Sequence, residues 1–166
     1  MFLAKSDHLT SIGVTIIMKL RVYLDTSVFS AYYDERLTDR QHQTEEFWAR
    51  WDEFEVATSE LAQQELAQTP DPVRRAQLQA LLTGVTIYPL TGEIRQLTQQ
   101  YLQAGVFTPV MLNDALHVAA AVLTRQDILL SWNFKHLVNR RRRARIHEIN
   151  TALGLPTLEI LAPPEV

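Results

Sequence analysis

Residues 113–131 read NDALHVAAAVLTRQDILLS and contain the most strongly patterned segments of the chain. The segment 113–124 is strongly apolar over a helical length and predicts a buried helix. The segment 128–131 is short and apolar, which predicts a buried strand. A buried helix that is followed closely by a buried strand is typical of α/β domains with a parallel sheet.

The same alternation of strands and helices extends along the rest of the chain. Further strands are expected at 20–25, 55–58, 85–88 and 157–160. Helices are expected at 41–54, 59–67, 73–83 and 92–104, with a short one from about 133 and another around 145–153. The aromatic side chains of 41–54 recur at helical spacing, which predicts part of the core or a face for a partner. The sequence therefore predicts an α/β domain with a mainly parallel sheet.

Composition restricts the class of protein and the kind of metal site. The chain has 166 residues, which suits one domain, and 46% of them are hydrophobic. It contains no cysteine, which excludes disulfides and cysteine zinc sites and fits a cytoplasmic protein. Its five histidines lack the close spacing of a zinc motif. Any metal is therefore expected on oxygen ligands, which favour magnesium or manganese.

The N-terminal segment and the charge give further expectations. Residues 1–17 are weakly patterned and predict a loose extension, so the domain is expected to span 18–166. No apolar run approaches the roughly 18 residues of a membrane span. The net charge of -3 argues against nucleic-acid binding by bulk charge alone, but the arginines at 140–143 and 145 form a local basic run. This run either contacts a phosphate backbone or is only a solvated helix face.

Three polar residues are expected to meet at one edge of the predicted sheet. Asp25 closes the first strand, Asn133 follows the strand 128–131, and Asp114 opens the helix 113–124. Ligands of open α/β sheets bind beyond the carboxyl ends of the strands, which is where these side chains can converge. Each also has a simpler explanation, because aspartate and asparagine commonly cap helices and form turns. His117, one turn after Asp114, is more simply a packed or supporting histidine than a metal ligand.

Glu65 is a fourth candidate for this edge. In the predicted helix 59–67 it lies beside an apolar stripe, where a carboxylate is costly unless something binds it. Glu60 is explained more simply by a favourable interaction with the helix dipole. Crowded carboxylates repel one another, and a divalent cation offsets this repulsion and can activate water for phosphodiester hydrolysis.

Three segments of the chain resemble one known family. VYLDTSVFSAYYDE (22–35), ATSELAQQEL (57–66) and NDALHVAAAVLTRQDILLSWNFKHL (113–137) are similar to the acidic blocks of PIN domains. The resemblance implies a three-layer α/β/α sandwich and RNA hydrolysis that depends on Mg²⁺ or Mn²⁺. Small members of the VapC-like group are toxins of type II toxin–antitoxin pairs. The resemblance therefore also implies a cognate antitoxin as partner and a homodimer.

The resemblance assigns roles to individual residues. Three acids match the first three acidic positions and are implied to be catalytic metal ligands: Asp25, Glu65 and Asp114. Glu65 matches the second position better than Glu60 does. The fourth position, usually aspartate, is Asn133, which offers an oxygen but no charge. Four residues are expected to contact the substrate or support the acids: Thr26, Ser131, Asn133 and His117.

Two alternatives to a metal-dependent endoribonuclease stay open. Phosphatases of the haloacid-dehalogenase kind also use an aspartate after the first strand. They need a second aspartate two positions on, where this chain has Ser27. A catalytically weak or inactive PIN-like module that binds RNA or a protein partner is compatible with Asn133.

Overall fold

The computed structural model describes residues 17–166, which form a parallel sheet of five strands. The strand order is β3-β2-β1-β4-β5, so the first strand lies at the centre. On this central strand Val22 pairs with Val56 on one side and with Ile128 on the other. The strands are β1 Leu20–Leu24, β2 Phe54–Ser59, β3 Thr86–Tyr88, β4 Ile128–Leu130 and β5 Glu159–Leu161.

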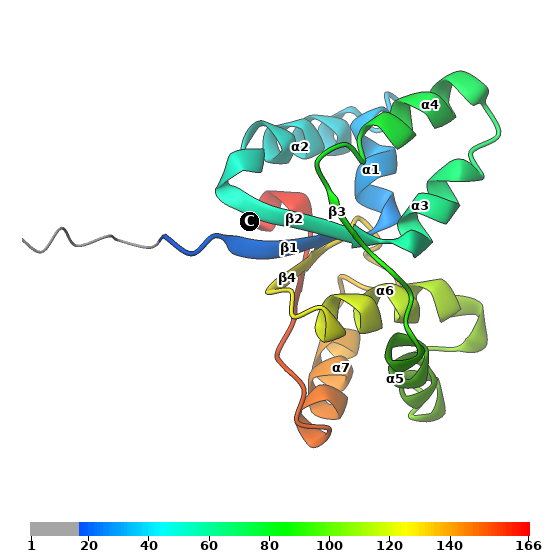
Figure 1. Cartoon of the computed structure of the whole chain (residues 1–166), viewed down its shortest axis with the longest axis vertical. Coiled ribbons are helices and arrows are strands. Elements are labelled where there is room, and N and C mark those ends of the chain that lie inside the picture. Colours follow the sequence, from blue (N-terminus) through cyan, green and yellow to red (C-terminus); the bar gives the residue numbers. More distant parts are fainter. Residues whose placement is uncertain (1–16) are drawn as a thin grey trace, which may run out of the picture.

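Helices cover both faces of the sheet (Figure 1). One face carries α1 Thr26–Tyr32, α2 Thr38–Ala49, α3 Glu60–Ala67 and α4 Pro72–Ala80. The other carries α5 Gly92–Gln103, α6 Leu112–Leu123 and α7 Arg140–Ala152. Short 3₁₀ helices occur at η1 Trp51–Glu53, η2 Pro109–Met111 and η3 Pro163–Glu165. The prediction of a three-layer α/β/α sandwich is therefore confirmed. None of the helices in residues 17–166 has the length and apolar character needed to cross a membrane.

Alternating side chains of the central strands contribute to two separate cores. Tyr23 and Leu129 belong to the apolar cluster that includes α5, α6 and α7. Val22, Leu24 and Leu130 belong to the cluster that includes α1 to α4. Successive strand residues point to opposite faces of a sheet, so strands covered on both faces are apolar throughout. All five side chains are fully buried, which gives the carboxyl ends of β1 and β4 a closely packed base.

Helix α6 is the most apolar helix of the fold. Every residue from Ala115 to Val122 is buried, as the prediction for 113–124 requires. Its four alanines are small and allow the helix to pack closely against the sheet and α5. This packing fixes Asp114, in the first turn of α6, at the edge of the sheet.

The predicted helix 41–54 is wrong at its C-terminal end. Helix α2 ends at Ala49, η1 follows it, and Phe54 is already the first residue of β2. The helical spacing of the aromatic residues misled the prediction because side chains from three successive elements pack into one cluster. Phe47 and Phe54 are buried, and their stacked rings lie 5.4 Å apart between centroids. The aromatic cluster is therefore part of the core.

The short helix predicted from about 133 is replaced by turns. The carbonyl of Asn133 accepts hydrogen bonds from both Leu137 N and Val138 N, which closes the turn. Helix α7 then begins at Arg140, earlier than the predicted start near 145, because Asn139 caps it by accepting a 2.9 Å bond from Arg142 N. Arginines oppose the dipole at a helix start, so the run 140–143 gave no signal for one.

Two further differences concern the starts of helices. Helix α1 was not predicted, and Asp25 forms its N-cap by accepting a hydrogen bond from Ser27 N. Ser59, predicted to cap α3, occupies the N-cap position but makes no capping hydrogen bond with its side chain. Its hydroxyl lies 2.7 Å from Tyr23 OH instead. The predicted extension 1–17 falls outside the described residues apart from Ile17.

Candidate active site

Asp25 lies at the carboxyl end of the central strand, where its side chain is almost fully buried. Its Oδ1 accepts hydrogen bonds from Ser27 N at 3.0 Å and Ser27 Oγ at 2.5 Å, and its Oδ2 accepts one from Ser131 Oγ at 2.5 Å. Burial raises the pKa of Asp25, although the nearby His117 and the bonds from Ser131 and Ser27 oppose the rise. A cation beside this carboxylate would offset the cost of its burial.

Asp114 is held by the turn that follows β4. Its Oδ1 accepts a hydrogen bond from Asn133 Nδ2 at 3.2 Å, and its Oδ2 lies 2.9 Å from His136 Nδ1. Asn133 N donates to Ser131 Oγ at 2.9 Å, and that hydroxyl donates to Asp25. This turn therefore connects Asp25 to Asp114 through a continuous set of hydrogen bonds.

The turn also fixes the orientation of the Asn133 amide. Its Oδ1 accepts a hydrogen bond from His136 N at 3.0 Å, which places the NH₂ group toward Asp114. Asn133 thus presents a neutral donor to the acid, and its oxygen is used within the turn. At this position an aspartate would present only acceptors to Asp114.

The two candidate glutamates of α3 lie in different surroundings. Glu65 Oε1 accepts a 2.9 Å bond from Thr26 Oγ1 and lies 2.9 Å from His117 Nε2. Asn113 Nδ2 approaches Glu65 Oε2 at 3.5 Å. Glu60 instead accepts a 3.1 Å hydrogen bond from Leu90 N, which holds the segment after β3 in place. The structure therefore places Glu65, and not Glu60, beside the neighbours of the other two acids.

Glu65 is held in its charged form by these contacts. Partial burial alone would raise its pKa, but the hydrogen bonds from His117 and from the Thr26 hydroxyl lower it and outweigh this effect. The pKa of Glu65 consequently lies below its ordinary value. Glu65 is an anion at neutral pH with its orientation fixed by two donors.

The predicted residues form two hydrogen-bonded groups, one around Asp25 and Asp114 and one around Glu65, which are together called the network. The two groups adjoin in the chain, because Thr26 follows Asp25 and Asn113 precedes Asp114. Each predicted supporting residue contacts at least one of the acids: Thr26, Ser131, Asn133 and His117. Within residues 17–166, no group of three or more His, Asp or Glu side chains is arranged to hold a metal ion. Asp25 and Asp114 are thus linked through Ser131 and Asn133, whereas Glu65 is held separately by Thr26 and His117, and the three acids do not form a ready-made ion cage.

The donor chemistry of the network fits a hard divalent cation. Carboxylate oxygens are the protein ligands that Mg²⁺ and Mn²⁺ prefer. Asp114 accepts one hydrogen bond on each oxygen, whereas a carboxylate offers about four acceptor positions, so capacity for an ion is left. The residues that would hold it are Asp25, Glu65 and Asp114.

Sequence reasoning missed several members of the network. Ser27 Oγ bonds Asp25 and also accepts a 2.8 Å bond from Trp132 N, which joins the start of α1 to the segment after β4. His136 contacts Asp114, and Tyr23 OH lies 2.8 Å from His117 Nδ1. These side chains are close in space but share no motif spacing. Only His136 had a signal in the sequence, because an asparagine that begins a turn often bonds the residue three positions later, which here is His136.

The arginine run forms the first turns of α7, beside the segment that holds Asp114. Three arginines donate to main-chain carbonyls: Arg142 to His136, Arg143 to Ile160 and Arg145 to Ala104. Arg140 and Arg141 are exposed and make no ion pair or side-chain hydrogen bond with the described part of the chain. Positive charge at a helix N-terminus is unfavourable, so these two arginines lack a structural explanation.

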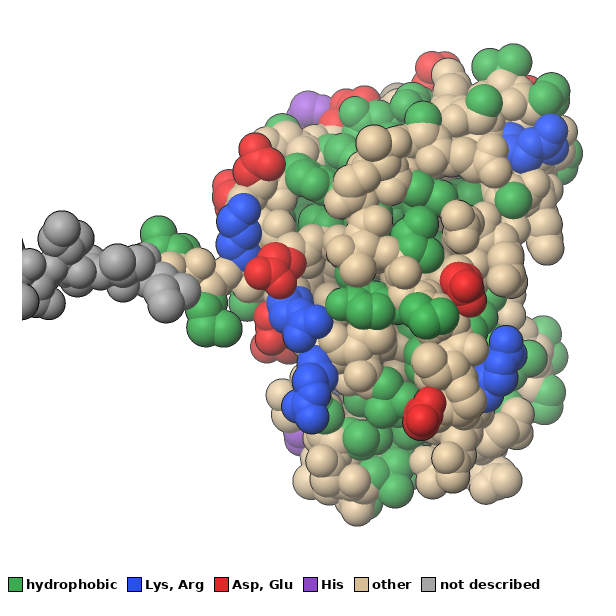
Figure 2. Space-filling model, in the orientation of Figure 1, with side chains coloured by type: hydrophobic (Ala, Val, Ile, Leu, Met, Phe, Trp, Pro, Cys, Tyr) green, Lys and Arg blue, Asp and Glu red, His purple; other side chains and the backbone are tan. Residues whose placement is uncertain are grey.

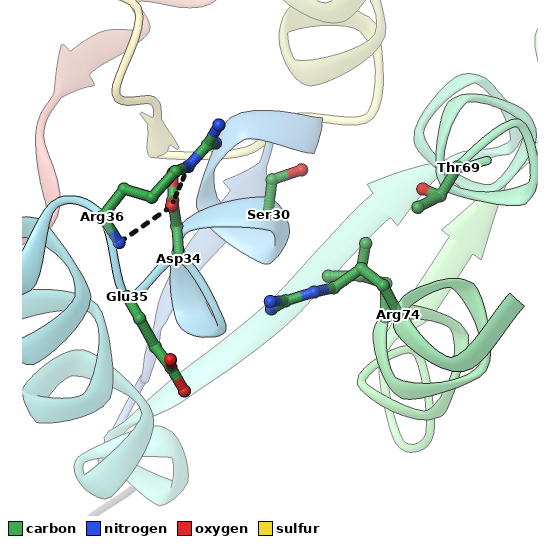
Figure 3. A pocket seen from close by; sticks show the side chains of 7 residues that line it. Ser30, Asp34, Glu35, Arg36, Thr69 and Arg74 are labelled. Atoms are coloured by element: carbon green, nitrogen blue, oxygen red, sulfur yellow. Dashed lines mark hydrogen bonds and ion pairs between the residues drawn. The ribbon is translucent and has the colours of Figure 1, made fainter. Parts of the chain in front are cut away.

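A pocket of about 430 Å³ is lined by side chains of α1, α4 and the segments next to them (Figure 3). Ser30, one helical turn after Thr26 on α1, lines it. Thr69, four residues after Glu65, lines it as well. Thr26 and Glu65, which bond each other, precede these two lining residues in the chain but do not line the pocket themselves.

The charges around this pocket balance one another. Arg36 pairs with Asp34 at 2.8 Å, and Arg74 donates to the carbonyl of Tyr33, while Glu35 adds a second acid (Figure 3). The pocket is therefore not an anion site by itself. On the face shown in Figure 2, acidic and basic side chains are likewise interspersed, with no extended basic surface.

Comparisons with known proteins agree with this architecture. The crystal structure of VapBC2 from Rickettsia felis bound to a DNA fragment from their promoter matches with a TM-score of 0.55 and 14% identity, covering 86% of this chain and 98% of that chain. A toxin–antitoxin complex from Klebsiella pneumoniae matches with a TM-score of 0.54 and 17% identity, covering 69% of this chain and 88% of that chain. No curated protein matches the sequence. The family model of the PIN domain matches residues 22–134, which is more than half of the chain and contains all three acids, so the chain belongs to the PIN domain family.

Proposed function

We propose that this protein is a metal-dependent endoribonuclease in which Asp25, Glu65 and Asp114 hold Mg²⁺ or Mn²⁺. The observation that carries the proposal is the pair of adjoining hydrogen-bonded groups that hold these acids, Asp25 with Asp114 in one and Glu65 in the other, in a chain of the PIN domain family. The network lies at the carboxyl ends of parallel strands, where α/β folds bind their ligands. Its acidic groups are carboxylates, which suit phosphodiester hydrolysis with a divalent ion.

The residues of the network orient the site before any ligand arrives. A bound divalent ion supplies positive charge for the leaving oxygen and activates water. Ser27 and Ser131 fix both oxygens of Asp25, while Asn133 and His136 fix those of Asp114. Side chains that are held in place need little rearrangement during the reaction, which lowers its barrier.

Arg140 and Arg141 are proposed to contact the RNA backbone. They are exposed, and the neighbouring Arg142 donates to the carbonyl of His136, which contacts Asp114. Contacts of this kind position a nucleic acid without selecting its sequence. Arg95, exposed on α5, offers a matched control at a different helix. Replacing Arg140 and Arg141 by glutamine should weaken RNA binding, whereas Arg95→Gln should not.

We further propose that the protein is the toxin of a type II toxin–antitoxin pair. It would act in the cytoplasm as a homodimer and be inhibited by a cognate antitoxin. Two proteins of the same fold come from toxin–antitoxin complexes, which supports this proposal. Expression of the wild-type chain should arrest bacterial growth, and expression of Asp114→Asn at equal level should not. Equal arrest by both would contradict a toxic activity at this site.

RNA cleavage by purified protein tests the nuclease proposal. Structured RNA is incubated with wild-type protein in Mn²⁺, in Mg²⁺ and in EDTA, and with Asp25→Ala and Asp127→Asn in Mn²⁺. Asp127 accepts a 2.8 Å bond from Arg21 N at the opposite end of the strands, so its variant controls for loss of an aspartate. Cleavage by wild type and Asp127→Asn, only with metal, supports the proposal. Cleavage that persists in EDTA or in Asp25→Ala would refute it.

One observation favours a second candidate, a PIN-like module that binds RNA or protein without cutting. Both oxygens of Asp114 already have partners, and residues 17–166 contain no ready-made group of three metal-binding side chains. RNA binding with no Mn²⁺ binding would select this candidate. The phosphatase alternative has less support, because the family is now known and Ser27 donates to Asp25.

A further inference from the structure

A buried line of polar groups leads from the carboxyl end of β2 to Glu65. Ser59 Oγ lies 2.7 Å from Tyr23 OH, and Tyr23 OH lies 2.8 Å from His117 Nδ1. His117 Nε2 lies 2.9 Å from Glu65 Oε1. The side chains of Ser59, Tyr23 and His117 are all buried, and the four residues come from β2, β1, α6 and α3.

The donors and acceptors that are available determine which group donates in each of these hydrogen bonds. The Thr26 hydroxyl donates to Glu65 Oε1, and a carboxylate oxygen can only accept, so His117 carries a proton on Nε2. A neutral imidazole then accepts at Nδ1, and Tyr23 donates to it. The Tyr23 oxygen in turn accepts from Ser59. Every hydroxyl proton in this arrangement has an acceptor.

The opposite direction leaves a buried donor without a partner. If His117 Nδ1 donated to Tyr23, then Tyr23 would donate to Ser59. The Ser59 hydroxyl is fully buried, and within residues 17–166 it contacts no second acceptor. A buried hydroxyl without an acceptor is costly, so the line runs from Ser59 toward Glu65.

We propose that Tyr23 is a positioning residue for Glu65, acting through His117 and supported by Ser59. Tyr23 sets which ring nitrogen of His117 bears the proton, and the Nε2–H that results holds the Glu65 carboxylate. This inference rests on the proposed function, in which Glu65 is a metal ligand. Residues that hydrogen-bond a metal ligand and fix its orientation contribute to metal affinity, although they do not contact the ion.

Tyr23→Phe tests the proposal, and Tyr101→Phe is its matched control. Tyr101 is also fully buried, in the same apolar core as α5, α6 and α7. Its hydroxyl donates one hydrogen bond to Asn150 Oδ1 at 2.6 Å, which Tyr101→Phe removes. Both variants therefore delete a buried phenol hydroxyl from the same core. Calorimetry with Mn²⁺ should show a Kd roughly tenfold weaker, or more, for Tyr23→Phe. The Kd of Tyr101→Phe should stay within about twofold of wild type.

A second readout needs no metal. Nitrogen chemical shifts of the imidazole in ¹⁵N-histidine-labelled protein report which ring nitrogen bears the proton, and His117→Gln assigns the signal. The metal-free wild type should show His117 protonated on Nε2, and Tyr23→Phe should shift this signal toward a mixture of tautomers. Tyr101→Phe should leave it unchanged. If Tyr23→Phe does not fold, the wild-type signal alone still tests the proposal, because Tyr23 can donate to His117 only where Nδ1 bears no proton.

The outcomes separate this inference from the proposed function. An unchanged Mn²⁺ affinity in Tyr23→Phe, with tight binding by wild type, would overturn the role of Tyr23 alone. A wild-type His117 protonated on Nδ1 would overturn it as well. No Mn²⁺ binding by wild type would overturn the proposed function together with the role given to Glu65.

Discussion

Replacing Asn133 by aspartate is predicted to destabilise the metal-free protein and to make its stability depend on metal. In the structure Asn133 Nδ2 donates to Asp114 Oδ1 at 3.2 Å, and the turn holds the amide in this orientation. An aspartate can still accept the hydrogen bond from His136 N with one oxygen. Its other oxygen then faces the Asp114 carboxylate with no proton between them.

The magnitude follows from this separation. Two unit charges 3.2 Å apart repel by about 5 kcal/mol at the effective dielectric constant of about 20 that suits sites near a protein surface. Rotation of the side chains, access of water and uptake of a proton reduce this cost. After these reductions, the free energy of unfolding is expected to be lower than that of wild type by about 2 kcal/mol. For a chain of this size, that loss lowers Tm by roughly 4–8 °C.

Thermal unfolding in EDTA and in excess Mn²⁺ measures the effect. The variant should melt below wild type in EDTA, and Mn²⁺ should raise its Tm by more than it raises that of wild type, because a cation offsets the new repulsion. Asn139→Asp is the matched control. Asn139 Oδ1 accepts from Arg142 N as Asn133 Oδ1 accepts from His136 N, but at the start of α7, where negative charge is favourable.

Three results would refute the reasoning. An Asn133→Asp protein as stable as wild type in EDTA would mean that the amide does not face Asp114. An equal effect of Mn²⁺ on both proteins would mean that no cation binds between these side chains. A loss of stability in Asn139→Asp of the same size would show that the cost comes from the turn and not from the acid pair.

Three more predictions concern charge at the site. In EDTA at pH 7.5, Asp25→Asn should be more stable than wild type in urea unfolding, because it removes a buried charge. Burial raises the pKa of Asp25, so the charged Asp25 destabilises the folded wild type at pH values above that pKa. The difference in the free energy of unfolding between the two proteins should therefore shrink as the pH falls toward 4. Replacing Arg140 and Arg141 by glutamine should lower the slope of log affinity for single-stranded RNA against log salt by about 1.4, and an unchanged slope would exclude both contacts. Glu65→Gln should weaken Mn²⁺ binding at least tenfold while Glu60→Gln does not, and equal effects would contradict the choice between them.

The parts of the fold that depend on periodic burial could be predicted from the sequence. The helix 113–124 and the strand 128–131 are apolar because both faces of β4 and nearly all of α6 are covered. Asp25 and Glu65 could be selected for similar reasons, since one ends a buried strand and the other borders an apolar stripe. Burial leaves a pattern in the sequence, and these residues stand out against it.

Elements and contacts that depend on local capping or tertiary packing could not be predicted. Helix α1 has only 7 residues and depends on the cap that Asp25 supplies. Helix α2 ends at Ala49 although aromatic residues continue at helical spacing, because Phe54 packs from a strand. Tyr23 and His136 join the site only through folding, since neither stands at a motif spacing from the acid it supports.

Calorimetric titration of Mn²⁺ into metal-free protein tests the central claim most directly, namely that the carboxylates of Asp25, Glu65 and Asp114 hold a divalent ion. Wild type should bind Mn²⁺, and Asp114→Asn, which keeps its size and its place in α6, should bind at least tenfold more weakly while unfolding at a similar temperature. Equal binding by both proteins, or no binding by wild type, would contradict the claim.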